Sequence, residues 1–231
     1  MKTKFFIITL LTLLSGTIAY AQREILPVDW KELKKVVKDE PELVKSLVER
    51  LTATKLDSTL TYNDRIIAFY GQALLSNNEE DTVVNDMIKL YNNGQFDESF
   101  EKAQEAIQIN PLNIQALYIS AMAISEMNDK GDTSHTIAEG QIFYNIVMRI
   151  FNTIAYTGYG TKEHPFYITK VSDEYAFMRY YLDLWEYGTQ SLEGTCDVFE
   201  LSETSKYYQE PKIYFDATLP LESIMKALGE L

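Results

Sequence analysis

The sequence predicts an α+β protein that is mostly helical. Up to about residue 157, apolar side chains recur at three- and four-residue spacing, which indicates amphipathic helices that pack on one another. After Gly158-Tyr159-Gly160 the apolar residues fall instead in short β-branched and aromatic runs bounded by turns, which indicates strands. We therefore expect a helical array followed by a small three-stranded antiparallel sheet with one helix.

The first 21 residues have the features of a cleavable secretory signal peptide. A short basic region precedes an apolar run over residues 5–14, and Ala19-Tyr20-Ala21 forms a small-x-small cleavage site. The apolar run is about half of the roughly 20 residues that a membrane-spanning helix needs, so we expect no stable membrane insertion after cleavage. Gln22 stands where a lipoprotein carries cysteine. The expected product is an exported protein, periplasmic or secreted, and not a lipoprotein.

The balance of charge limits the partners that the chain is expected to bind. The formal net charge is −13, and it becomes −15 when residues 1–21, which carry two lysines and no acidic residue, are removed. A surface of this sign repels nucleic-acid phosphates and anionic lipid, so we expect no nucleic-acid partner. The single cysteine, Cys196, leaves no pair for a disulfide within the chain, so stability is expected to come from packing.

The mature chain is expected to begin with three helices. Asp29 is placed to cap the first, and Pro41 starts the second after a polar break. Thr61, with Asp64 three residues later, resembles a capping box at the start of the third. The polar stretch 76–81 lacks helical periodicity and is the predicted boundary. The mature chain is thus divided into an N-terminal helical segment 22–80, a helical region 81–157 and a C-terminal α+β region 158–231.

Residues 83–113 carry the most specific pattern in the chain. Gly94 and Phe96 fall where a tight turn joins two predicted helices, Ala106 lies on the second helix, and Pro111 follows it. Glycine permits the turn, phenylalanine wedges between the helices, alanine allows close packing, and proline starts the next helix. The order and spacing resemble a tetratricopeptide repeat, which has a period of roughly 34 residues.

A second, incomplete repeat is expected to follow. Residues 114–127 continue as a first helix, but an enlarged turn at 128–133 separates them from their partner. The partner helix, at about 136–156, is longer than a repeat helix and dense in apolar residues, which predicts that it is deeply buried.

Three apolar runs in the last third of the chain predict three strands. They lie around 166–171, 196–201 and 213–215. Between the first two runs, Ser172 is expected to cap a helix that extends over about 173–187.

Short motifs spread over nearly all of the mature chain resemble a known family. They are Leu47-Val48-Glu49-Arg50-Leu51, Asp57-Ser58-Thr59-Leu60-Thr61, Tyr70-Gly71, Asn110-Pro111-Leu112-Asn113, Val171-Ser172-Asp173-Glu174-Tyr175 and Ile213-Tyr214-Phe215-Asp216. Together they resemble domain-of-unknown-function family 4919, a family of exported Bacteroidetes proteins. The chain departs from the family at Arg50-Leu51, where the family has Arg-Phe, and at Phe69-Tyr70-Gly71, where it has Tyr-Tyr-Gly. The resemblance implies a periplasmic or secreted helical protein with C-terminal strands, and it implies no activity or site residue.

The acidic motif Ser172-Asp173-Glu174-Tyr175 is the most suggestive candidate for chemistry. Adjacent carboxylates beside a hydroxyl suit acid–base work or the binding of a cation. The same residues also suit a helix N-terminus, and adjacent residues on a helix face different directions. We therefore interpret the motif as a helix cap.

No other group of residues has the spacing of a reactive site. His135 and His164 are far apart in the sequence and belong to no metal-ligand motif. The Gly-Thr-Lys within 158–162 lacks the order of a phosphate-binding loop. We expect no metal, no cofactor and no catalytic residue. The 16 tyrosines and 11 phenylalanines suit either a groove for sugar or peptide or a packed core, and their helical spacing favours the core.

The function that the pattern favours is that of a noncatalytic exported protein that binds a protein or peptide partner, because stacked repeat helices form concave faces. The competing interpretation has these residues packed against the N-terminal helices or the strands. The alternative function is an envelope or secreted hydrolase with an acidic site in the C-terminal region, which carboxylates converging in an aromatic cleft would favour. The residues expected to line the partner-binding face are Val84, Ile88, Tyr91, Asn92, Gln115, Tyr118, Met122 and Glu126.

Overall fold

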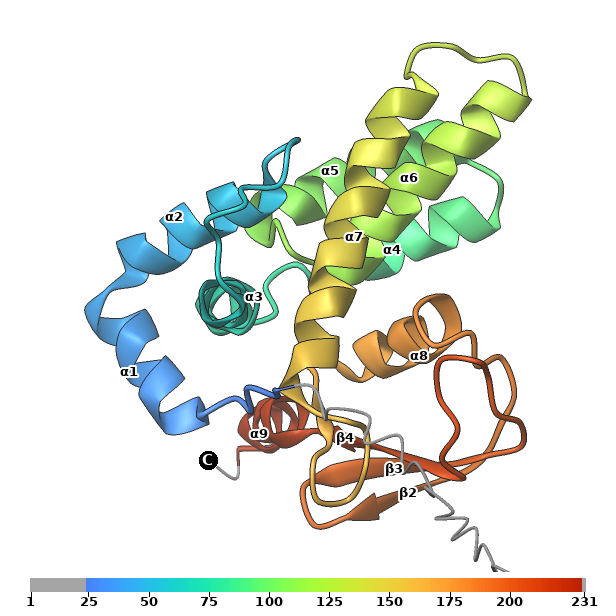
Figure 1. Ribbon diagram of the computed structural model, residues 1–231. Helices are drawn as coiled ribbons and strands as arrows, with labels where there is room; N and C mark the ends of the chain where they lie inside the picture. Colours follow the sequence, from blue (N-terminus) through green and yellow to red (C-terminus); the bar gives the residue numbers. More distant parts are fainter. Residues whose placement is uncertain (1–23, 230–231) are drawn as a thin grey trace, which may run out of the picture.

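A computed structural model describes residues 24–229, and the predicted signal peptide lies outside these residues. Within them the chain is mostly helical, with a small sheet near the C-terminal end (Figure 1), which confirms the predicted fold class. The helices are α1 (Trp30–Asp39), α2 (Pro41–Thr52), α3 (Tyr62–Ser76), α4 (Asp81–Asn92), α5 (Phe96–Ile109), α6 (Ile114–Asp129), α7 (Ile137–Thr157), α8 (Val171–Tyr180) and α9 (Thr218–Ala227). The strands are β1 (Phe166–Tyr167), β2 (Tyr187–Glu193), β3 (Cys196–Leu201) and β4 (Lys212–Asp216).

The helix starts predicted in the N-terminal segment are confirmed. The Asp29 side chain accepts a hydrogen bond from the backbone N–H of Glu32 at 3.0 Å, and α2 starts at Pro41. Thr61 and Asp64 form the expected capping box at α3, with distances of 2.9 and 3.2 Å. These caps satisfy backbone donors that the first turn of a helix leaves free.

Helices α4 to α7 follow one another through short connections. Gly94 lies in the turn between α4 and α5 with a φ of 75°, as expected for a turn that needs a left-handed residue. The Asn113 side chain caps α6 by accepting a hydrogen bond from the N–H of Ala116 at 3.0 Å. A capping box at Thr136 opens the long helix α7.

The sheet differs from the predicted one. It has four strands in the order β1-β4-β3-β2, and β1 pairs with β4 in parallel, whereas the other pairs are antiparallel. The prediction of three antiparallel strands was wrong because residues 187–193, which were assigned to no strand, form β2, and because β1 pairs in parallel. Helix α8 stops at Tyr180, since Asp183, with a φ of 56°, turns the chain out of the helical direction. Helix α9 was not predicted.

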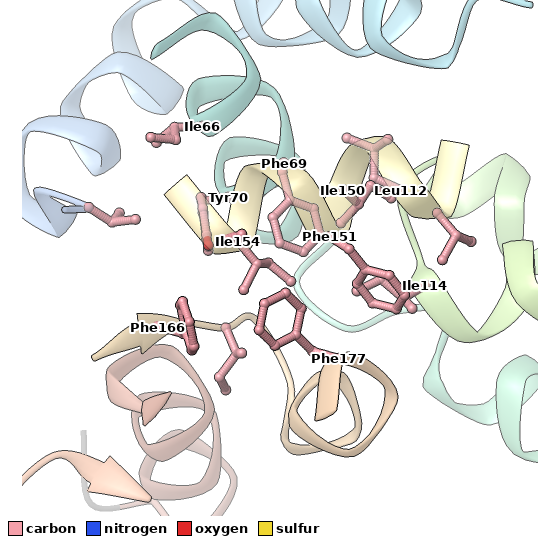
Figure 2. Close-up of a cluster of buried hydrophobic side chains, with 14 of the residues drawn as sticks. Ile66, Phe69, Tyr70, Leu112, Ile114, Ile150, Phe151, Ile154, Phe166 and Phe177 are labelled. Atoms are coloured by element: carbon pink, nitrogen blue, oxygen red, sulfur yellow. The ribbon is translucent and has the colours of Figure 1, made fainter. Parts of the chain in front are cut away.

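One apolar core joins the three segments of the chain. Helix α7 crosses the middle of the molecule (Figure 1), and Val147, Ile150 and Phe151 on it are fully buried. Figure 2 shows the ring of Phe177, from α8, between those of Phe151 and Phe166, at centroid distances of 5.7 and 5.0 Å. The helices and the strand region are therefore held by shared burial of aromatic side chains. No helix within residues 24–229 is long and apolar enough to cross a membrane.

Candidate functional site

A groove runs between α4 and α6 on one side and α8 on the other. One part has a volume of about 330 Å³ and is lined by Tyr91, Gln115, Tyr118 and Arg179, among others. The adjoining part, of about 380 Å³, shares Ile88, Gln115 and Ser172 with the first and continues past the N-terminal end of α8. We call these two joined hollows the helical groove.

The residues predicted to bind a partner lie mostly at this groove. Ile88, Tyr91, Asn92, Gln115 and Tyr118 line its first part, and Val84, almost fully buried, lines its second. The other two lie elsewhere on α6.

Met122 lines a separate shallow hollow between α6 and α7. Glu126 lines none of the five main cavities of the described residues. It nevertheless lies near the groove, because burial, followed by the negative charge of Glu126, raises the pKa of Tyr91.

Helix α8 supplies the wall of the groove that the sequence did not predict. Phe177 and Met178 on one side of α8 enter the core, whereas Tyr175, Ala176 and Arg179 face the groove. The amphipathic spacing of α8 was visible in the sequence, but its packing against α6 joins segments far apart in the chain. Sequence periodicity indicates that a helix has a buried face and does not identify the helix it packs against.

Three side-chain amides at the groove make no hydrogen bond with any described residue. They belong to Asn85 and Asn92 on α4 and to Gln115 on α6. Asn85 and Asn92 are seven residues apart and therefore lie on one face of their helix, two turns apart. Each amide carries two N–H donors and one carbonyl acceptor. The groove thus offers spaced donors and acceptors beside tyrosine rings.

A buried ion pair fixes the position of α8 at one end of the groove. The Lys170 ammonium lies 2.9 Å from Oε1 of Glu80, which is fully buried, and it also contacts Asp81. The same Glu80 oxygen accepts hydrogen bonds from the amides of Asn110 and Asn113 at 2.8 and 3.1 Å. Burial alone would raise the pKa of Glu80, but Lys170 and these donors outweigh it and lower the pKa.

The motif Ser172-Asp173-Glu174 forms the start of α8, but Ser172 is not its cap. The N-cap is Lys170, and Ser172 lies inside the first turn. Oδ2 of Asp173 accepts hydrogen bonds from the N–H and hydroxyl of Thr169 at 3.1 and 2.7 Å and from the N–H of Lys170 at 3.0 Å. The prediction that Ser172 is the cap was therefore wrong. The motif still stabilises the helix start, because Asp173, the third residue of α8, accepts a hydrogen bond from the N–H of the N-cap Lys170.

Glu174 is a buried acid with no donor to stabilise its charge. It is fully buried, and neither of its carboxyl oxygens has a hydrogen-bond partner among the described residues. Burial, the charge of Asp197 and the charge of Asp173 raise the pKa of Glu174 to about 9. Glu174 is therefore neutral at pH 7. None of the five cavities is lined by Glu174, Asp173 or Asp197, so this acid pair does not face a cleft.

The remaining sequence candidates lie apart from one another. The His135 ring packs on Phe100 and the His164 ring on Tyr159, at centroid distances of 4.4 and 5.7 Å. Lys162 pairs with Glu193 at 3.1 Å instead of facing a phosphate-sized hollow. Across residues 24–229 no cluster of three His, Cys, Asp or Glu side chains has an arrangement that could hold a metal ion.

The fold and the groove define a mostly helical α+β protein with a cleft between helices. Residues 31–226 match the model of a family described as a domain of unknown function, DUF4919, and the chain belongs to this family. Searches of curated proteins and of solved structures return no match.

Proposed function

We propose that this chain is a noncatalytic binding protein that holds an extended peptide segment of a partner protein in the helical groove. The observation that carries the proposal is the set of amides of Asn85, Asn92 and Gln115, which line the groove and bond to no described residue. An extended peptide presents N–H and C=O groups in alternation, and a side-chain amide bonds to both.

The tyrosines of the groove suit the side chains of such a peptide. Tyr91, Tyr118 and Tyr175 come from three different helices and line one hollow. Tyr118 stacks on Tyr180 with a centroid distance of 4.3 Å, which holds its ring in place. Rigid aromatic rings supply contact area at low cost in conformational entropy, which favours binding.

The repeat interpretation and export are part of this proposal. The pairing of α4 with α5 and of α6 with α7, together with the glycine turn at Gly94, supports tetratricopeptide-like repeats. Residues 1–21 support export to the periplasm or the medium, and Gln22 after the expected cleavage site supports a product without a lipid anchor. The family resemblance supports a Bacteroidetes origin.

The hydrolase alternative receives less support from the geometry. A neutral acid at pH 7 suits a general acid, but Glu174 is fully buried and borders none of the cavities. The groove itself contains the carboxylate of Asp81, which is paired with Lys170. A hydrolase needs carboxylates that converge on a substrate, so the groove supports binding over catalysis.

The test is selection of phage-displayed random 12-residue peptides on the purified chain, followed by fluorescence anisotropy with the selected peptides after synthesis. We expect Asn92→Ala combined with Gln115→Ala to weaken binding about tenfold, since each lost hydrogen bond contributes about 0.5–1.5 kcal/mol. Asn93→Ala, an exposed amide next to Asn92 but outside the groove, is the matched control and should bind normally. Failure to select any peptide, or equal binding by all variants, contradicts the proposal.

A further inference from the structure

The largest of the five main cavities of the described residues lies at the C-terminal end of α8 and shares Arg179 and Tyr180 with the helical groove. Its volume is about 840 Å³, and it is enclosed by α7, the C-terminal end of α8 and the loop 202–211. Figure 1 shows this loop beside α8. The lining is dominated by tyrosine, tryptophan and phenylalanine rings. We call it the aromatic cleft.

Two rings of the aromatic cleft are more exposed than aromatic side chains usually are in a folded domain. Trp185 is 55% exposed and Tyr207 is 59% exposed. The indole of Trp185 is nevertheless held in place, because its Nε1–H donates to Oδ1 of Asp183 at 2.9 Å. The edge of Tyr180 also contacts it, at a centroid distance of 6.1 Å. An exposed ring with a fixed orientation is a preformed surface for stacking.

The loop that carries Tyr207 is fixed as well. The hydroxyl of Tyr208 lies within hydrogen-bond distance of the backbone carbonyls of Gly160 and Lys212, at 2.7 and 2.9 Å, and its single proton is shared between them. The N–H of Tyr207 donates to Oγ of Ser205 at 3.1 Å, and the Ser205 hydroxyl in turn bonds to the Leu182 carbonyl. The opposite wall of the cleft is therefore tied to the end of α8.

The cleft contains one cation and one anion, Arg179 and Asp183. Arg179 makes no ion pair with any described residue, its Nε is buried without a hydrogen-bond partner, and its guanidinium lies 5.3 Å from the Trp185 ring centre. Asp183 uses one carboxylate oxygen for Trp185, and further acceptor sites remain. The cleft thus offers hydrogen-bond donors and acceptors that no described residue uses. The charges of Arg179 and Asp183 cancel.

We propose that the aromatic cleft is a binding site for a neutral saccharide. One face of a sugar ring carries C–H groups, which pack on the electron-rich face of an aromatic ring, whereas its hydroxyls both donate and accept hydrogen bonds. Trp185 and Tyr207 supply the faces, Arg179 supplies donors and Asp183 supplies acceptors. Apart from Arg179 and Tyr180, the lining of the aromatic cleft differs from that of the helical groove, and the proposal does not depend on peptide binding there.

Other ligand classes fit these groups less well. A cationic ligand at the Trp185 ring would be repelled by the Arg179 guanidinium, which lies 5.3 Å from the ring centre. An anionic ligand would meet Asp183 and a chain with a net charge of −13. A wholly apolar ligand would leave Arg179 and Asp183 desolvated without partners.

The test uses maltohexaose, cellohexaose and xylohexaose as neutral probes, with a hexamer of galacturonic acid as the acidic arm. Binding to the purified chain is measured by isothermal titration calorimetry and by tryptophan fluorescence, since Trp185 is one of only two tryptophans. We expect at least one neutral probe to bind saturably and to change the fluorescence. The galacturonic acid hexamer should bind at least tenfold more weakly.

Variants assign the binding to the cleft. Trp185→Ala should lose at least tenfold in affinity for the neutral probe, and Tyr207→Ala should also weaken it. Leu192→Ala changes a side chain that is equally exposed, at 55%, but lies outside the cleft, and it should bind normally. A thermal melt of each variant confirms that it is folded. Absence of binding by all three neutral probes, tighter binding of the acidic hexamer, or unchanged affinity of folded Trp185→Ala overturns the proposal.

Discussion

The ammonium of Lys170 lies 2.9 Å from Oε1 of Glu80, and this pair joins the N-terminal ends of α4 and α8. Glu80 is fully buried, and its carboxylate also accepts hydrogen bonds from the side-chain amides of Asn110 and Asn113, which lie in the turn between α5 and α6. One carboxylate therefore connects three parts of the chain. Because α4 and α8 form opposite walls of the helical groove, the Glu80–Lys170 pair fixes the distance between those walls.

Lys170→Met is expected to destabilise the chain by about 3–5 kcal/mol, because it leaves the buried carboxylate of Glu80 without its cation. A double variant that also carries Glu80→Gln should be more stable than Lys170→Met alone, since no unpaired charge is then buried. The control is Lys34→Met, which breaks an exposed ion pair with Glu222 and should cost less than about 1 kcal/mol. Urea denaturation measures all three, and equal losses for Lys170→Met and Lys34→Met would contradict the structural role.

The buried acid Glu174 predicts a dependence of stability on pH. Its pKa of about 9 in the folded chain lies above the ordinary 4.5, so only the unfolded chain ionises it between these values. Neutral Glu174 makes its full contribution to the free energy of unfolding below pH 4.5. This contribution falls as the pH rises and becomes constant above about pH 9.

Glu174→Gln should remove this dependence, because the amide stays neutral at every pH. At pH 8 the variant should be more stable than the parent chain by at least about 1 kcal/mol, which corresponds to about 2–4 °C in Tm. Near pH 4 the two should melt together. Glu186→Gln, at an exposed position, is the control and should melt like the parent chain at both values. Parallel pH profiles for Glu174→Gln and the parent chain would show that Glu174 ionises normally.

The start of α8 predicts unequal effects of two neighbouring substitutions. Asp173→Ala should cost about 1–3 kcal/mol, because Asp173 accepts three hydrogen bonds in a buried position. Ser172→Ala should change stability by less than about 0.5 kcal/mol, since its hydroxyl bonds to no described residue. Thermal or urea denaturation of both variants measures the two losses of stability. A larger loss for Ser172→Ala than for Asp173→Ala would indicate that Ser172 is the helix cap.

Gly94→Val should destabilise the turn between α4 and α5 by about 1–3 kcal/mol, because valine is disfavoured at a φ of 75°. A Cβ at this position meets no atom within 4 Å, so the loss comes from the backbone alone. Gly94→Asn should cost less, since asparagine tolerates this conformation better. If the midpoint of urea denaturation is the same for the valine and asparagine variants, backbone conformation does not control this turn.

The features that were predicted correctly depend on residues close together in the sequence. Asp29 bonds three residues ahead, Thr61 and Asp64 bond each other, and Gly94 needs only its own φ. Such local interactions follow from residue types at fixed spacing. For the same reason, five of the eight residues expected on the partner-binding face line the same hollow, because helical periodicity places them on one side of α4 and α6.

Two of the features that were missed depend on contacts between distant segments, namely the parallel pairing of β1 with β4 and the use of α8 as a groove wall. The raised pKa of Glu174 is of the same kind, because it depends on burial and on the charge of Asp197, which lies on β3. Strand β2 is different, because it pairs with the adjacent strand β3 in a hairpin. By itself the sequence determined the starts of α1, α2 and α3, the turn at Gly94 and the overall α+β class. Only the tertiary structure decided which faces meet, because side-chain periodicity specifies that a face is apolar but not what covers it.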